Sequence, residues 1–180
     1  EKNVSVAHCP TVFGRTGMTL ESFGGYVRAG VNLGIGIDSF PFNMLEELRH
    51  AAIYSRITAG NVHDVTTTSV FNAATLGGAQ ALLREDIGRL AEGAKADFSV
   101  VDTEHPLMQP GREPLRNLIY IAAERAIKDV YVDGIKVVDD GKVLTMDYDN
   151  ALGEIDAAQK RAIQKVPELD AKKRTLDDIA

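Results

Sequence analysis

Apolar residues in the first sixty positions form two short continuous runs, each followed by a helical repeat. The runs cover residues 4–8 and 31–38, and the helical repeats cover residues 19–29 and 43–57. Strands that are apolar on both faces are typical of a parallel sheet covered by helices. The order strand–helix–strand–helix therefore predicts two consecutive β/α units of a parallel α/β fold.

The next stretch, residues 62–83, has a helical pattern. Asp64 stands where an N-cap is expected, because its carboxylate can accept hydrogen bonds from the first free amide groups of a helix. The pair Gly77–Gly78 lies inside the pattern and predicts a break into a longer and a shorter helix.

From residue 88 to residue 143 the period of the pattern changes to two, which is typical of strands. Asp-Gly pairs at residues 133–134 and 140–141 are strong hairpin signals. We expect a small antiparallel module, with strands at residues 98–101, 119–121, 130–132 and 136–138. The charged tail from residue 149 carries a thin apolar stripe, and we expect a helix that packs loosely on the surface.

Asp38 ends the second apolar run, directly before a loop and a helical repeat. An acid at the C-terminal end of a buried strand occupies the place where (β/α) barrels carry catalytic residues. The alternative is that Asp38 caps the next helix or satisfies a turn. The local pattern leaves both interpretations open.

Composition narrows the class of protein. The 180 residues are 44% hydrophobic and 26% charged, which is ordinary for a globular domain, and the net charge of −6 argues against nucleic acid or an anionic membrane surface as a partner. The single cysteine, Cys9, excludes an internal disulfide. The apolar runs are too short for a membrane span and no signal peptide is recognisable, so we expect a cytoplasmic protein. Because a strand pattern begins almost at Glu1, we expect the chain to start inside a fold.

Five motifs follow one another along the first four-fifths of the chain. They are VAHCP at residues 6–10, AGVNLGIGIDS at 29–39, AATLGGAQAL at 73–82, IGRLAEGAKADF at 87–98 and VYVDGIKVV at 130–138. In this order they resemble the amidohydrolase superfamily, specifically its deaminase and chlorohydrolase branch. Members of that branch are metal-dependent (β/α)8 barrels with a small β-sandwich. The resemblance implies an α/β fold that is the C-terminal part of a (β/α)8 TIM-type barrel plus part of a small β-sandwich domain.

The sequence also departs from the family pattern. The family's histidine ligands, an H-x-H motif and two later histidines on earlier strands, have no counterpart here, and a complete barrel needs about 250 residues. We therefore interpret residues 1–87 as the last two β/α units of the barrel with the following helices. Residues 88–145 are expected to be a β-sandwich portion, and residues 146–180 a C-terminal helical tail.

The resemblance implies a metal-dependent hydrolase of carbon–nitrogen bonds other than peptide bonds. The expected reaction is deamination of an amino-substituted heterocycle or guanidine-like compound by metal-activated water. Asp38 would be both a metal ligand and the catalytic proton acceptor. Zinc is the favoured divalent metal and iron the alternative. The alternatives in function are hydrolytic dehalogenation of a related ring, and a truncated, non-catalytic fragment, because the chain alone is expected to be inactive.

Two further residues are candidates for binding a small-molecule substrate. His8 ends the first strand, and Arg15 follows it in a predicted loop, where a guanidinium could hold an anionic group. The alternatives are a strand-end histidine bonded to the backbone and a solvent-exposed arginine. His50, three residues after Glu47, is interpreted as part of a solvated helix face rather than as a metal site. Open strand edges also predict a homo-oligomer.

Overall fold

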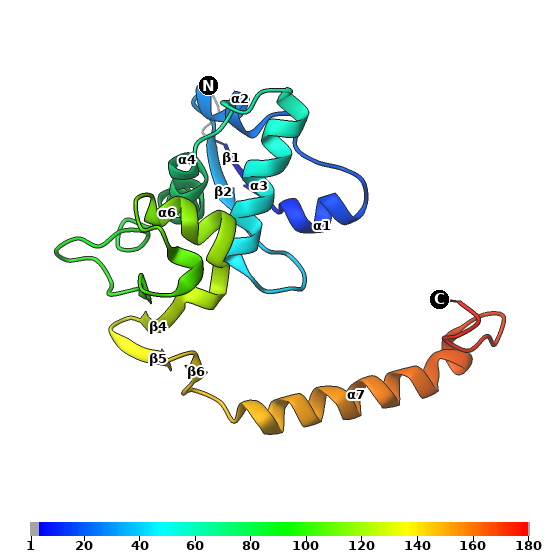
Figure 1. Ribbon diagram of the computed structural model, residues 1–180. Helices are drawn as coiled ribbons and strands as arrows, with labels where there is room; N and C mark the ends of the chain where they lie inside the picture. Colours follow the sequence, from blue (N-terminus) through cyan, green and yellow to red (C-terminus); the bar gives the residue numbers. More distant parts are fainter. Residues whose placement is uncertain (1–3, 180) are drawn as a thin grey trace.

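The computed structural model describes residues 4–179 and shows a mixed α/β chain with two separate sheets (Figure 1). In the first sheet, β1 (Ser5–His8) and β2 (Asn32–Ile35) pair in parallel, as the apolar runs predict. The helices that follow these strands are α1 (Pro10–Arg15), α2 (Phe23–Arg28) and α3 (Met44–Ala59). The expected order is confirmed, with α1 as a short additional helix that begins at a proline, a residue favoured in the first helical turn.

Strand β2 is shorter than the apolar run predicts, since it ends at Ile35 rather than at Asp38. The amide of Gly36 still donates to the carbonyl of His8 at 2.9 Å, but the chain then leaves the sheet. Asp38 has a left-handed backbone with a φ of 62°. Such a conformation cannot continue a strand, and Asp is one of the few residues that adopts it readily.

The helical stretch after residue 66 runs through Gly77 and Gly78 without a break, so the predicted division there is wrong. It consists of α4 (Thr67–Asn72), the π-helical turn η1 (Ala73–Gly77) and α5 (Gly78–Ala81). Both glycines keep right-handed helical dihedrals. Their function is close packing, because Asn32 on β2 donates its side-chain amide to the carbonyl of Gly77 at 3.1 Å. The N-cap is Thr66 rather than Asp64, whose carboxylate is used elsewhere.

A methyl group at Gly77 is expected to destabilise the fold, whereas one at Gly78 is not. A Cβ on Gly77 would overlap the carbonyl oxygen of Leu33 in β2, while on Gly78 its nearest neighbour is the Ala73 carbonyl oxygen at 3.9 Å. We expect Gly77→Ala to lower the free energy of unfolding by about 1–3 kcal/mol. Gly78→Ala should be neutral or stabilising by up to about 1 kcal/mol, because alanine favours the helix. Urea unfolding of both variants measures the difference, and equal stabilities would contradict this packing.

The second sheet contains four antiparallel strands in the order β3-β4-β5-β6. They are β3 (Phe98–Val101), β4 (Ile127–Val132), β5 (Ile135–Asp139) and β6 (Lys142–Val143). Both Asp-Gly pairs form the turns between these strands, and all four turn residues have positive φ. The hairpins predicted from the sequence are therefore confirmed.

The strand predicted at residues 119–121 is wrong, because this segment is helical. After the short 3-10 helix η2 (Pro106–Met108), the chain forms α6 (Pro114–Asn117), η3 (Leu118–Ala122) and η4 (Ala123–Ala126). The residues buried in η3 are Leu118, Ile119 and Ala122, a helical spacing. A three-residue apolar run cannot distinguish a strand from a buried helix.

The core lies between the parallel strands and the helices around them. It is built from Phe23, Leu33, Ile35, Leu48, Ala51, Ala52, Val65, Val70, Ala73 and Ile119. In contrast, α7 (Tyr148–Leu169) extends away from this body, and each of its residues is at least partly exposed (Figure 1). The predicted tail helix is confirmed, but its expected packing on the surface is wrong. Within residues 4–179, no helix is both long and apolar enough to cross a membrane.

Candidate functional site

The C-terminal ends of β1 and β2 bring together two segments that are distant in the sequence, since His8 lies opposite Ile35. His8 is the register partner of Ile35, so Cys9 and the loop 36–39 leave the sheet at the same edge. A Cβ built on Gly36 would lie 3.2 Å from the sulfur of Cys9, which shows how closely the two segments approach. This edge is where the sequence places the candidate site.

Asp38 lies at this edge with an exposed side chain. Its charge reaches Cys9: burial raises the pKa of the Cys9 thiol, and the carboxylates of Asp38 and Glu47 raise it further. A thiol with a raised pKa is protonated at neutral pH and is a poor nucleophile. Cys9 is therefore not suited to act as a nucleophile, whereas the exposed carboxylate of Asp38 is accessible to a ligand from solvent.

Glu47 is a residue of this site that the sequence analysis did not recognise. It lies on α3, is 1% exposed, and its Oε2 accepts a hydrogen bond from the backbone amide of Thr11 at 3.0 Å. Among the described residues, no hydrogen-bond partner reaches its buried Oε1. The hydrogen bond from Thr11 to Oε2 links α3 to the start of α1, the segment that follows β1.

His50 supports the same segment. Its Nδ1 lies 2.7 Å from the hydroxyl oxygen of Thr11, and its ring stacks on Tyr54 with 5.4 Å between ring centres. Glu47 and His50, on one face of α3, thus both contact Thr11 at the start of α1. The interpretation of this pair as a solvated helix face is wrong, because Glu47 is buried and His50 is half-buried.

His8 lies at the end of β1, as predicted, but its side chain is 3% exposed. The ring lies 6.0 Å from that of Phe23, a residue of the core. Burial lowers the pKa of His8 to about 4, so the ring is neutral at pH 7. Its predicted contact with a substrate stays a prediction.

Arg15 is the last residue of α1 rather than part of a loop, which differs from the expectation. Its guanidinium lies 4.5 Å from the centre of the Phe40 ring, and Phe40 belongs to the loop that follows Asp38. This cation–π contact brings Arg15 to the same side of the fold as Asp38. The Arg15 side chain is therefore placed near the candidate site, and its role in substrate binding stays a prediction.

The described residues do not form a complete metal site by themselves. Within residues 4–179, no three His, Cys, Asp or Glu side chains lie close enough to hold a metal ion. A catalytic zinc typically takes three protein ligands. Asp38 can offer one exposed carboxylate, and the remaining ligands would have to come from outside this segment.

Comparison with known proteins shows the family to which the chain belongs. A sequence profile of the amidohydrolase family matches residues 1–138. The 5-methylthioadenosine/S-adenosylhomocysteine deaminase of Pelotomaculum thermopropionicum is 31% identical over 169 residues, which are 92% of this chain and 38% of the relative. A deaminase of the same description from Archaeoglobus fulgidus is 36% identical over 147 residues, or 78% of this chain and 34% of the relative.

Two solved structures show a similar fold. An adenosine deaminase from Xanthomonas campestris with bound zinc superposes with a TM-score of 0.82 at 32% identity, covering 88% of this chain and 37% of that chain. The atrazine chlorohydrolase of Arthrobacter aurescens, complexed with zinc, superposes with a TM-score of 0.77 at 25% identity, covering 86% and 36%. The chain thus spans little more than a third of the length of these proteins. The profile match over most of its residues shows that the chain belongs to the amidohydrolase family.

Proposed function

We propose that this chain is the C-terminal part of a metal-dependent hydrolase that deaminates a small aminopurine nucleoside. The observation that carries the proposal is Asp38, an exposed acid at the shared edge of two parallel strands, within a segment that matches zinc-containing relatives over most of its length. On this proposal β1 and β2 are the last two strands of a (β/α)8 barrel. The sheet β3–β6 is part of a small β-sandwich.

The substrate class comes from what the relatives act on. Their names include 5-methylthioadenosine, S-adenosylhomocysteine, 5'-deoxyadenosine and adenosine. In all four an adenine ring, which carries an exocyclic amine, is attached to a ribose. Deamination replaces this amine by oxygen from water and releases ammonia. Dehalogenation is the second candidate, because the atrazine chlorohydrolase shares the fold, but its 25% identity is below that of the deaminases.

Zinc is the metal proposed, since both solved relatives contain it. Such a metal supplies water with a pKa lowered to about 7. Asp38 would hold the metal through one carboxylate oxygen and keep the other free to accept a proton and pass it to the leaving nitrogen. Arg15 and His8, at the same strand ends, would line the substrate site.

The test uses the longer enzyme that we propose contains this chain. Purified with zinc, it should release ammonia from adenosine or S-adenosylhomocysteine and no chloride from atrazine. Chloride release without ammonia release would favour the dehalogenase. The absence of both products would contradict the proposal.

The 180-residue chain alone is expected to retain no zinc or iron after dialysis and to show no deaminase activity. A single carboxylate at an open edge can neither fix the geometry of a metal ion nor complete its coordination. Elemental analysis of the dialysed chain is the measurement. One equivalent of metal that disappears in the Asp38→Asn variant would mean that this segment holds a complete site.

A further inference from the structure

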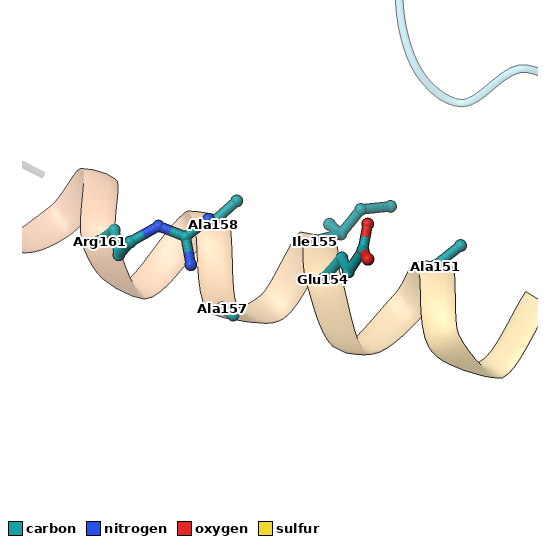
Figure 2. Close-up of a pocket in the computed structure, with 6 residues that line it drawn as sticks. All are labelled: Ala151, Glu154, Ile155, Ala157, Ala158 and Arg161. Carbon is teal, nitrogen blue, oxygen red and sulfur yellow. The ribbon is translucent and has the colours of Figure 1, made fainter.

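Helix α7 carries an apolar stripe that is interrupted once, at Gln159. Residues recur at helical spacings of three, four and seven, and the stripe consists of Tyr148, Leu152, Ile155, Ala162, Val166 and Leu169. The exposed fractions of Leu152, Ile155 and Leu169 are 48%, 65% and 83%. Figure 2 shows Ile155 with Ala151 and Ala158 along one side of the helix, where they line a shallow hollow with Glu154 and Arg161. An apolar surface of this extent usually marks a contact with another molecule.

The charges of α7 are divided between its two halves. Up to residue 158 all its charged residues are acidic, at Asp149, Glu154 and Asp156. From residue 159 onward three are basic, at Lys160, Arg161 and Lys165, and only Glu168 is acidic. One half of the helix is therefore negative and the other positive. This distribution is favourable to the helix dipole except at Glu168, in the last turn.

Such a helix is complementary to a second copy of itself in antiparallel orientation. With Ile155 opposite Ala162 of the other copy, the acidic half of each helix faces the basic half of its partner. Asp156, which borders the stripe, then lies within reach of Lys160 of the other copy. A parallel pair would instead place like charges together, which is destabilising. The 22 residues give a contact about 33 Å long, or three heptads.

We propose that α7 is a dimerisation helix whose apolar stripe packs antiparallel on the same stripe of a second copy of this chain. Small residues, Ala162 in the stripe and Ala151 and Ala158 beside it, allow the two helices to approach closely. The intrahelical ion pair between Lys160 and Asp156, at 2.6 Å, is exposed at both ends and therefore contributes little in the monomer. In the dimer both side chains also lie close to opposite charges of the partner.

Charge reversal tests this proposal through recovery of the dimer on mixing. The 180-residue chain should sediment as a dimer in a concentration series. The variants Glu154→Lys/Asp156→Lys and Lys160→Glu/Arg161→Glu/Lys165→Glu should each dimerise more than about tenfold more weakly, because like charges then face each other. A 1:1 mixture of the two variants should restore the dimer. The control Glu92→Lys/Glu104→Lys, at two exposed sites outside α7, should leave the dimer unchanged.

Cross-linking tests the orientation. In a chain with Cys9→Ala, Ala151→Cys and Val166→Cys variants should form a disulfide when mixed, and Ala151→Cys alone should form none.

A monomeric wild-type chain at all concentrations would overturn the proposal and would leave the stripe to another part of the enzyme. A dimer that both charge variants retain would also overturn it, since the contact would then lie outside α7. Cross-linking of Ala151→Cys with itself would contradict the antiparallel arrangement.

Discussion

Replacement of Asp38 by Asn in the complete enzyme is expected to lower kcat by about two to four orders of magnitude, the loss typical of removing a general base. Asparagine keeps the shape of the side chain and tolerates the left-handed backbone at this position, where φ is 62°. It lacks the negative charge and the basic oxygen. The effect should therefore appear in catalysis rather than in folding, and steady-state kinetics with an adenosine substrate measures it.

A matched control separates the carboxylate from its backbone conformation. Asp140, in the turn between β5 and β6, also has positive φ, at 47°. Asp140→Asn should leave kcat unchanged, because this turn belongs to the other sheet. Zinc content should be measured for both variants. An Asp38→Asn enzyme that keeps its zinc and a near wild-type kcat would show that Asp38 has no catalytic role.

The sequence predicts those parts of the fold in which a local pattern has one structural solution. The two apolar runs became β1 and β2, and the two Asp-Gly pairs became hairpin turns with positive φ. The failures come from tertiary contacts that override local preference. Gly77 suggests a helix break, yet it remains helical because its missing side chain lets the helix approach the backbone of Leu33. The run at residues 119–121 is a buried helix whose neighbours decide its conformation.

For the candidate site, the sequence locates the edge of the sheet but not the residues that organise it. The two parallel strands bring Asp38 close to Cys9, and Arg15 reaches the loop after Asp38 through Phe40. Glu47 is missed because a charged residue on a helix normally faces solvent. One signal was available: Glu47 shares its helical face with Ala51 and Ser55, which are both buried.

A second acid, Asp64, joins three segments of the core-forming region. Its Oδ2 accepts hydrogen bonds from Ser55 on α3 at 2.5 Å and from the amide of Gly24 on α2 at 3.2 Å. Its Oδ1 lies 2.8 Å from the guanidinium of Arg28. Burial by itself would raise the pKa of Asp64, but the hydrogen bonds from Ser55, Arg28 and Gly24 outweigh it, and the pKa is lowered.

Asp64→Ala is therefore expected to lower the free energy of unfolding by about 2–4 kcal/mol at pH 7, since it removes charge-assisted hydrogen bonds and leaves buried donors without an acceptor. Arg28→Ala should lower the free energy of unfolding by less than about 1 kcal/mol. The Arg28 side chain is 63% exposed, so water can take over its hydrogen bonds to Asp64. Urea unfolding of the 180-residue chain measures both values. Equal losses in the two variants would mean that the ion pair, rather than the buried hydrogen bonds, carries the stabilisation.

The pH dependence of this loss follows from the lowered pKa of Asp64. In the unfolded chain the carboxyl titrates near its ordinary pKa of about 3.9, whereas in the folded chain it stays ionised to lower pH. The stabilisation is therefore fully present above the unfolded pKa and is lost as the pH falls through the folded pKa. The stability difference between wild type and Asp64→Ala should be constant from pH 6 to pH 7 and should shrink below about pH 4. A difference that grows as the pH falls would show that the folded state raises the pKa of Asp64, because burial would then outweigh the donors that surround it.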